Sequence, residues 1–530
     1  MRTVQHLGLL LFIAILLTGC PSGAEKTQTD KKKDEKTTTT TPAVEEPSVD
    51  TSEGDALLKD DESKWGSDID ETKKNYSLYR EYYKQQNYND ALPFWRYVYQ
   101  NAPSARKTPL VNGVKMYNWL LDEEIVGVFC EDGEVEGKSR NECKKAKKGK
   151  FKAYKFKNPA VAQAYQDTML MIYNTRQEHF GEEGTIYTLK YRLVKKYDPL
   201  AEDSLYNMQQ KIIELDSEYS SYDVVKDYFK NLYYTELKDK TITNEDFIAK
   251  YDALTEIIDF NVNRNEDNDE DAIADYEKVG TYMSEKYDKW SEAVEKQTQV
   301  TAVKNLTDCP SIKSHYGAEY AAAPNDINAI KTYYKALKRG GCKNDPDFMK
   351  LLIKWSEVEP SASRLRYIAQ QYQKSSNLNE AQNYYQKSLE IETDPSKKAK
   401  TYLSLARIAQ VNKQYSKARD LARKAIENQA GWGTPYMLIG DLYASSTSSV
   451  KSDGVNGRTA YYAAVDMYEK AKDVDPSVSD KADEKIKKYR AAFPSQDDKT
   501  NYFMQKSKPF PAIGQRISVG GWIGQSTTVR

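Results

Sequence analysis

Between residues 365 and 425, bulky and small side chains return at matching positions in two consecutive stretches. Leu378 and Ala381 mark the first stretch, and Tyr415 and Ala418 mark the second. Apolar residues within each stretch have helical spacing, and the two alanines are separated by close to the ~34 residues of a two-helix repeat. Small residues let paired helices approach, while bulky residues fill the groove between them. The pattern therefore predicts serial helical hairpins.

The same spacing occurs in two further places. Residues Tyr76 to Pro103 fall at the intervals of one tetratricopeptide repeat (TPR), although Tyr79 stands where such repeats usually have Gly. A third C-terminal copy is split by a Ser-, Thr- and Gly-rich segment, residues 444–458, which we expect to be an exposed loop. The predicted repeat-packing residues are Leu78, Tyr82, Tyr88, Ala91, Trp95, Tyr372, Ala381, Tyr385, Tyr415, Ala418, Gly440, Tyr443, Ala464 and Tyr468.

These patterns predict an all-α fold, an α-solenoid of TPR-like helical hairpins. A first hairpin occupies residues 64–110, and a C-terminal array with a polar capping helix occupies residues 346–494. Six amphipathic helices are predicted between them, at residues 160–179, 185–196, 205–219, 221–237, 244–260 and 271–295. We interpret residues 111–345 as degenerate repeats with a Cys-containing insertion at 121–157. A separate helical domain in this region is the alternative.

The N-terminus has the features of a secretory signal. Arg2 precedes an apolar run from Leu7 to Leu17, which is shorter than a membrane span. The run ends in Leu17-Thr18-Gly19-Cys20, which resembles the bacterial lipobox, and this resemblance implies lipidation of Cys20 after removal of residues 1–19. Residues 20–63 have almost no apolar side chains and are predicted to be a disordered tether. An ordinary signal peptide with a chance cysteine is the alternative.

Four further cysteines remain: Cys130, Cys143, Cys309 and Cys342. An even number in an exported protein indicates disulfides. Of the three possible connectivities we favour the local one, Cys130 with Cys143 and Cys309 with Cys342, because each pair brackets a plausible loop or hairpin. Four free thiols are the alternative. The sequence has no Cys-x-x-Cys pair, so no metal site is predicted.

Charge gives little indication of a partner. The chain has 78 Lys and Arg against 79 Asp and Glu, so no overall field would attract nucleic acid. Residues 144–157 contain eight lysines interleaved with aromatic residues, which could contact an anionic lipid or a glycan. The candidate contacts are Lys150, Lys152, Lys155 and Lys157. An acidic stretch, residues 122–136, precedes them and could neutralise them instead.

The sequence contains no recognisable catalytic motif. His179 and His315 are the only histidines after the signal segment, and neither belongs to a nucleophile or metal motif. We therefore predict no enzyme activity and no cofactor. The apolar tail, residues 495–530, contains Phe510, Trp522 and Ile523 and is predicted to fold back on the last repeats in extended form. The alternative is that Trp522 docks into a partner protein.

Several stretches resemble an exported TPR lipoprotein family of Bacteroidota. They are Thr168 to Tyr173 with His179-Phe180-Gly181, Asp308-Cys309 through Gly341-Cys342, and Val519 to Gly524. The resemblance covers most of the chain after residue 70. It implies export and a helical-repeat architecture, and it supplies no catalytic residue.

The expected function is that of an adaptor, lipid-anchored in the cell envelope at the outer membrane. Its concave helical face would hold a protein or peptide of a secretion or outer-membrane assembly complex, with affinity supplied by a few buried aromatic residues. Two alternatives remain open at this point. One is a lipoprotein that binds glycan or peptidoglycan, and the other is an envelope hydrolase.

Overall fold

The computed structural model describes residues 61–263, 270–298, 308–448, 457–507 and 509–530. The predicted signal segment, Cys20 and the tether as far as residue 60 lie outside these ranges, as does most of the predicted loop at 444–458. In the ranges that are described, no helix has both the length and the apolar character needed to cross a membrane.

We divide the described chain into a first half, residues 61–298, and a second half, residues 308–530. The helices of the first half are η1 (Glu62–Trp65), α2 (Ile69–Lys84), α3 (Tyr88–Asn101), α4 (Lys107–Glu124), α5 (Asn141–Lys145), α6 (Pro159–Phe180), α7 (Glu183–Tyr197), α8 (Glu202–Asp216), η2 (Ser217–Tyr219), α9 (Tyr222–Asn231), η3 (Leu232–Glu236), α10 (Asn244–Asn263) and α11 (Glu270–Thr298). Its strands are β1 (Ile125–Cys130), β2 (Gly133–Glu136) and β3 (Phe151–Phe156).

The second half continues the helical pattern. Its helices are α12 (Cys309–Ala322), α13 (Ile327–Arg339), α14 (Pro346–Val358), α15 (Ala362–Lys374), α16 (Leu378–Ile391), α17 (Pro395–Val411), α18 (Tyr415–Asn428), α19 (Thr434–Ala444), α20 (Ala460–Val474), η4 (Pro476–Val478), α21 (Ser479–Arg490) and α22 (Gln496–Lys506). Its strands are β4 (Arg516–Val519) and β5 (Gln525–Thr528). All six helices predicted between residues 160 and 295 are confirmed, with small shifts at their ends.

Local sequence determines where many helices begin. The side chains of Asn158, Asp345 and Asp394 accept hydrogen bonds from the first backbone N–H groups of α6, α14 and α17, and each is followed by Pro. This combination suits a helix start, because the capping oxygen satisfies an N–H group and Pro has none to leave unpaired. Pro395 therefore begins α17, as well as closing the preceding hairpin as predicted.

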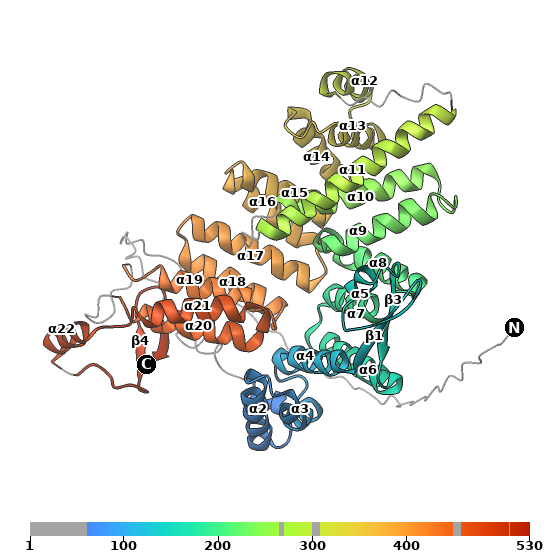
Figure 1. The fold of residues 1–530 in the computed structure, drawn as a ribbon. Helices are drawn as coiled ribbons and strands as arrows, with labels where there is room; N and C mark the ends of the chain where they lie inside the picture. The colour runs from blue at the N-terminus through green and yellow to red at the C-terminus, as the bar shows by residue number, and fades with distance from the viewer. Residues whose placement is uncertain (1–60, 264–269, 299–307, 449–456, 508) are drawn as a thin grey trace, which may run out of the picture. The chain divides into compact units, whose positions relative to one another are not determined.

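Neighbouring helices pack as antiparallel pairs, which confirms the predicted all-α array of TPR-like hairpins (Figure 1). Examples are α2 with α3, α15 with α16, α17 with α18 and α19 with α20. The small repeat residues Ala91, Ala381, Ala418 and Ala464 are all fully buried. Close helix approach thus occurs at the small side chains, as the sequence pattern indicated.

The predicted insertion contains strands that the sequence analysis did not anticipate. β1 is the central strand of an antiparallel sheet in the order β2-β1-β3. Val128 and Cys130 point to its buried side, while Phe129 is partly exposed on the other. The Cys130–Cys143 disulfide ties β1 to the short helix α5.

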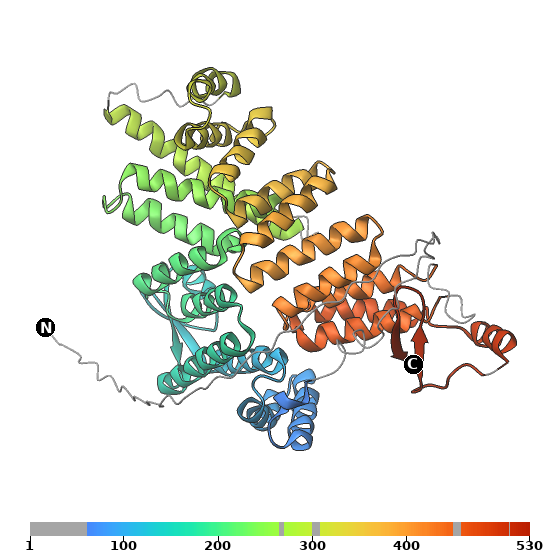
Figure 2. The same cartoon turned by 180° about the vertical axis from the view of Figure 1, so that it is seen from behind.

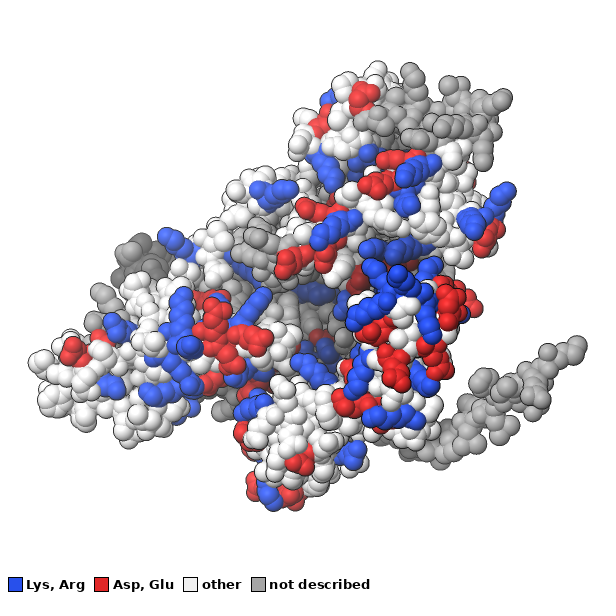
Figure 3. All heavy atoms as spheres, viewed as in Figure 1, with Lys and Arg blue, Asp and Glu red and all other residues white. Residues whose placement is uncertain are grey.

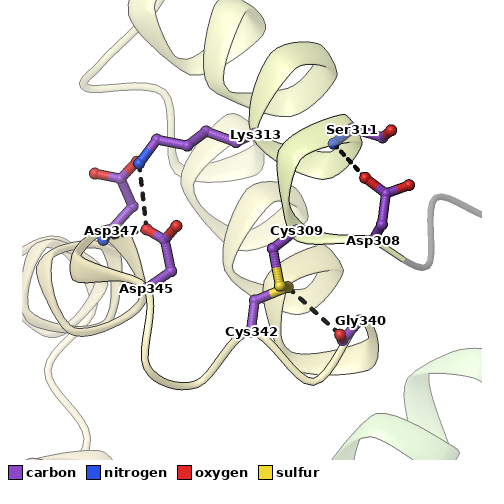
Figure 4. The surroundings of a disulfide bond; sticks show 8 residues. All are labelled: Asp308, Cys309, Ser311, Lys313, Gly340, Cys342, Asp345 and Asp347. Carbon is purple, nitrogen blue, oxygen red and sulfur yellow. Dashed lines mark hydrogen bonds and ion pairs between the residues drawn. A yellow bond between two sulfur atoms is a disulfide. The ribbon is translucent and has the colours of Figure 1, made fainter.

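The second disulfide joins Cys309, the first residue of α12, to Cys342 after α13 (Figure 4). Beside it, the Asp308 side chain accepts a 2.8 Å hydrogen bond from the Ser311 N–H group, and Lys313 lies 3.4 Å from Asp345. Both local cysteine pairings are therefore confirmed.

The second half runs back alongside the first, so segments distant in sequence are neighbours (Figures 1 and 2). α4 contacts α20, and α10 contacts α15. Buried charges join the two halves at these places. Arg366 on α15 donates to Glu218 of η2 at 2.7 Å and to Glu392 after α16, also at 2.7 Å.

A second buried ionic contact lies nearer the ends of the array. Lys107 on α4 is within 3.3 Å of Glu182 and 3.8 Å of Asp475, and all three side chains are less than a tenth exposed. Gln429, after α18, donates to Glu182 at 2.9 Å. By contrast, each cluster of buried apolar side chains comes from one half alone. Apolar packing builds each half, and polar groups supply the buried contacts between the halves.

Candidate functional site

The strongest candidate for a binding surface is the part of the second half that holds the C-terminal tail. β4 and β5 pair antiparallel from Arg516↔Thr528 to Val519↔Gln525. Alternate residues of both strands are buried, and β5 packs against α20. Val519 and Ile523 join the apolar cluster of α17 to α21. The predicted tail that folds back on the last repeats in extended form is therefore confirmed for β4 and β5. The sequence analysis did not predict that these strands pair as a β-hairpin, or that the tail begins with helix α22.

The turn of this hairpin presents an aromatic anchor. The Trp522 ring lies 5.8 Å from the Tyr415 ring and 5.6 Å from the Tyr443 ring, measured between centroids. The Arg419 guanidinium is 5.5 Å from the Trp522 centroid and donates to the backbone carbonyls of Trp522 and Ile523 at 3.0 and 2.9 Å. Packing between aromatic rings, a cation near a ring and main-chain hydrogen bonds are contacts with which proteins hold a peptide.

We call this surface the tail groove: Tyr415, Ala418, Arg419, Leu442 and Tyr443, which come from α18 and α19. Three of its residues, Tyr415, Ala418 and Tyr443, were predicted from the repeat pattern. Arg419 was not predicted, and no local signal marks it, because an Arg next to a buried Ala on a helix is usually a surface residue.

Charged groups hold the other end of the hairpin. Thr527 donates to Asp466 at 2.5 Å, and Arg530 contacts Asp466 at 2.5 Å and Glu469 at 2.7 Å. Burial raises the pKa of the Asp466 carboxyl, although Thr527 and Arg530 favour its ionised form. The hairpin is thus fixed by an aromatic anchor at its turn and by ionic contacts at its end.

Two buried groups of the docked hairpin lack hydrogen-bond partners. Both amide atoms of Gln525, which is fully buried, are unpaired, and so is the Trp522 indole N–H. An unpaired buried polar group costs ~1–3 kcal/mol. The tail therefore contacts the tail groove through its Trp522 ring and its main chain, while three of its buried side-chain atoms have no hydrogen-bond partner.

The other predicted repeat residues belong to the packing of the array. Trp95 is buried against α4, Tyr385 is buried against α17, and Gly440 on α19 faces the buried Tyr468 ring. Leu78, Tyr82, Tyr88 and Tyr372 are half-buried. These positions stabilise the array rather than form one site.

The four predicted anionic-contact lysines are all exposed, with Lys152 and Lys155 on β3. The Lys155 ammonium forms an ion pair with Glu134 of β2 at 2.5 Å. The backbone N–H of Lys150 donates to the Glu131 carboxylate at 3.0 Å. Blue and red side chains are intermixed over the face seen in Figure 3. Acidic neighbours thus offset part of this basic segment.

The two histidines lie apart from each other on the surface. His315 is 3.7 Å from Glu319, one turn along α12, and His179 is exposed near the end of α6. Among the described residues, no group of three or more His, Cys, Asp or Glu side chains could hold a metal ion.

Comparisons with known proteins found no matching family model and no matching curated protein. Similar solved structures include the C-terminal part of a TPR repeat-containing protein from Cytophaga hutchinsonii, with 14% identity over 65% of this chain and 95% of that chain and a TM-score of 0.26. Yeast Tom70 has 13% identity over 65% and 81% of the two chains, with a TM-score of 0.19. The Cut9–Hcn1 assembly of the APC/C has 13% identity over 79% and 90%, with a TM-score of 0.24. At these TM-scores, none of the likenesses bears on function.

Proposed function

We propose that this protein is a lipid-anchored scaffold of the cell envelope that binds a segment of another protein and catalyses no reaction. The observation that carries the proposal is the tail groove. There, helices α18 and α19 hold a peptide segment through the Trp522 ring and through two backbone carbonyls bound by Arg419. Main-chain contacts of this kind do not depend on the peptide's side chains, so the same surface can accept other segments.

Unmatched polar groups in the docked tail also support the proposal. The Gln525 side-chain amide and the Trp522 indole N–H have no hydrogen-bond partners in the docked tail. A peptide segment that has no unpaired polar groups at these two positions would therefore bind better than the tail does. A partner could then displace the hairpin from the tail groove.

The lipid anchor is the second part of the proposal, and it rests on the lipobox-like sequence that ends at Cys20. Acyl chains contribute ~0.8 kcal/mol for each buried methylene, so two or three chains hold a protein at a membrane. Confinement to that surface raises the effective concentration of membrane-bound partners, which makes even weak contacts useful. The outer membrane is the proposed location.

The scaffold role is tested by crosslinking in the native envelope, followed by mass spectrometry of the proteins that co-purify with the chain. We compare the wild type with Trp522→Ala, which weakens tail docking and opens the groove. We expect a discrete protein partner whose recovery rises in Trp522→Ala. The matched control is Phe503→Ala, because Phe503 on α22 is 55% exposed and should leave recovery unchanged.

Recovery of glycan fragments alone, or equal recovery from all forms, would contradict binding at the tail groove. The anchor is tested separately by metabolic labelling with an alkyne fatty acid. Wild type should carry the label and partition into membranes, whereas Cys20→Ala should lose the label and enter the soluble fraction. A labelled Cys20→Ala form would refute lipidation at this residue.

A further inference from the structure

Three large apolar side chains are exposed in one short segment, which we call the C-terminal arm: α22 together with residues Pro509 to Arg516. Phe503 is 55% exposed, Met504 67% and Ile513 78%, the highest value among the large apolar residues that the structure describes. α22 lies at an outer end of the molecule, where the surface is mostly white (Figures 1 and 3). Several exposed apolar residues close together mark a surface that is covered when the protein is at work.

α22 presents these side chains because its other face packs on the protein. Tyr502 is 3% exposed, and its ring lies 5.4 Å from the Phe510 ring in an edge-on arrangement. Phe503 and Met504 follow Tyr502 directly, and successive residues of a helix are ~100° apart, so both point away from this buried face. Because Phe510 reaches back to α22, the residues that lead to Ile513 stay near the helix.

The charges of the arm have one sign. Residues 499–530 contain five Lys or Arg and no Asp or Glu, in a chain whose basic and acidic residues are almost equal in number. Lys506 ends α22 and Arg516 begins β4, and both are exposed. The acidic residues of α22, Asp497 and Asp498, belong to its first turn, ~12 Å along the helix from Lys506. The exposed apolar side chains therefore stand among basic residues.

We propose that the C-terminal arm docks on the surface of an anionic lipid bilayer. Phe503, Met504 and Ile513 enter the interface between head groups and acyl chains, while Lys506 and Arg516 contact lipid phosphates. Large apolar and basic side chains combine in this way in segments that lie in a membrane interface. Each basic residue close to an anionic leaflet strengthens binding by about fivefold. A second copy of the chain fits less well, because two arms of like charge repel each other.

The proposal goes beyond the scaffold role and takes from it only the location at a membrane. Forty residues separate Cys20 from Asp61, and a chain of that length reaches up to about 140 Å, so an acyl anchor alone does not select the face that meets the bilayer. Docking of the arm selects that face and holds the adjoining tail hairpin near the lipid. Because the acyl anchor holds the chain independently, loss of one arm side chain leaves partner recovery unchanged.

The test is photocrosslinking of the full lipid-anchored chain with p-benzoylphenylalanine, an apolar residue that reacts with neighbouring C–H groups. The vesicles are phosphatidylcholine alone or an equal mixture of phosphatidylcholine and phosphatidylglycerol, and lipid adducts are measured by mass spectrometry. Met504→p-benzoylphenylalanine should give at least about fivefold more lipid adduct on the anionic vesicles than on the neutral ones. The matched control is the same replacement at Met171 on α6, which is 55% exposed and should give little adduct on either.

A second pair of variants tests the apolar contact. Ile513→Asp, added to the position-504 probe, places a carboxylate that the apolar interface and the anionic lipid both disfavour, and it should reduce the adduct at least about fivefold. The matched control is Val411→Asp, because Val411 at the end of α17 is 67% exposed and outside the arm. Neither position belongs to a core, so both variants should fold.

A position-504 adduct that is absent, equal to that at position 171, or independent of lipid charge would overturn the proposal. A crosslink to a protein in its place would mean that the arm docks on another protein. Failure of the acyl anchor has a different signature: both probe variants would leave phosphatidylcholine vesicles, while the position-504 adduct on anionic vesicles would remain. Failure of the tail groove would alter only the recovery of the protein partner.

Discussion

Replacing Arg366 with Met should destabilise the contact between the two halves by about 3–5 kcal/mol. The Arg366 side chain is 2% exposed, and its partners Glu218 and Glu392 are 7% and 9% exposed. Met retains much of the apolar stem but leaves two buried carboxylates without a counter-charge. Removal of one partner from a buried ion pair costs about 3–5 kcal/mol, mainly because the remaining charge stays desolvated.

Hydrogen exchange followed by mass spectrometry is the suitable assay, because a long repeat array need not unfold in one step. Segments containing η2 and the α16–α17 connection should exchange faster in Arg366→Met than in wild type. Arg490→Met is the matched control, since Arg490 is 53% exposed and pairs with Glu469 at the surface. An exposed pair contributes no more than about 1 kcal/mol.

A pH series adds an independent signature. Burial disfavours the Glu392 carboxylate, but the Asp394 N–H and Arg366 outweigh burial and lower its pKa. A lowered folded-state pKa gives stability that is present above the ordinary Glu value and is lost as the pH falls through the lowered value. Arg366→Met should show less of this acid-dependent loss. Exchange rates equal to those of Arg490→Met, with an unchanged acid dependence, would refute the argument.

Three further outcomes are expected. Gly440→Ala should lower the melting temperature, because its Cβ would lie 2.5 Å from the Tyr468 ring, whereas Gly317→Ala, with its nearest contact at 3.4 Å, should be neutral or stabilising. Burial raises the pKa of Asp216 to about 6 in the folded protein, so the free energy of unfolding falls as the pH rises from about 4 to 6. Asp216→Asn removes the buried charge and should stabilise the protein by about 1–3 kcal/mol at pH 7.5, measured by urea unfolding. At pH 4 the same substitution should have little effect. Ala418→Trp should overpack its hairpin and cost more than about 1 kcal/mol, and an unchanged melting temperature would contradict the repeat register.

Helical spacing predicted the fold because TPR-like hairpins depend on local residues. Ala381 and Ala418 are buried where paired helices approach, and this requirement is visible in sequence as a small residue among bulky ones. The disulfide pairing could also be predicted from the sequence, because the two cysteines of each pair are only 13 and 33 residues apart.

The insertion shows why strands were missed. α4 ends at Glu124 and β1 begins at the next residue, so no Gly, Pro or Asn marks the change. β3 alternates only in part, because Ala153 and Tyr154 stand together between the exposed Lys152 and Lys155. These lysines also belong to a run that resembles a solvated segment. Strands this short carry less signal than a helix of several turns.

The contact between halves had no sequence signal at all. Glu218 and Arg366 are 148 residues apart, and each stands in an otherwise ordinary amphipathic helix or turn. Isolated charged residues are usually solvated, so nothing in the local pattern distinguishes these two from the other charges of the chain. The tail hairpin was missed for a related reason, because its turn glycines, Gly521 and Gly524, indicate a turn but not the groove that receives it.

The paired halves have a consequence for how such a chain can change. In an open repeat array, each unit contacts only its neighbours, so units can be duplicated or deleted at little cost. Here Lys107 must meet Glu182 and Asp475, while Arg366 must meet Glu218 and Glu392. Adding or removing one hairpin in either half would shift every later pairing out of register. The length of one half therefore constrains the length of the other, and insertions should be tolerated only where they leave that register intact, as in the loop between α19 and α20.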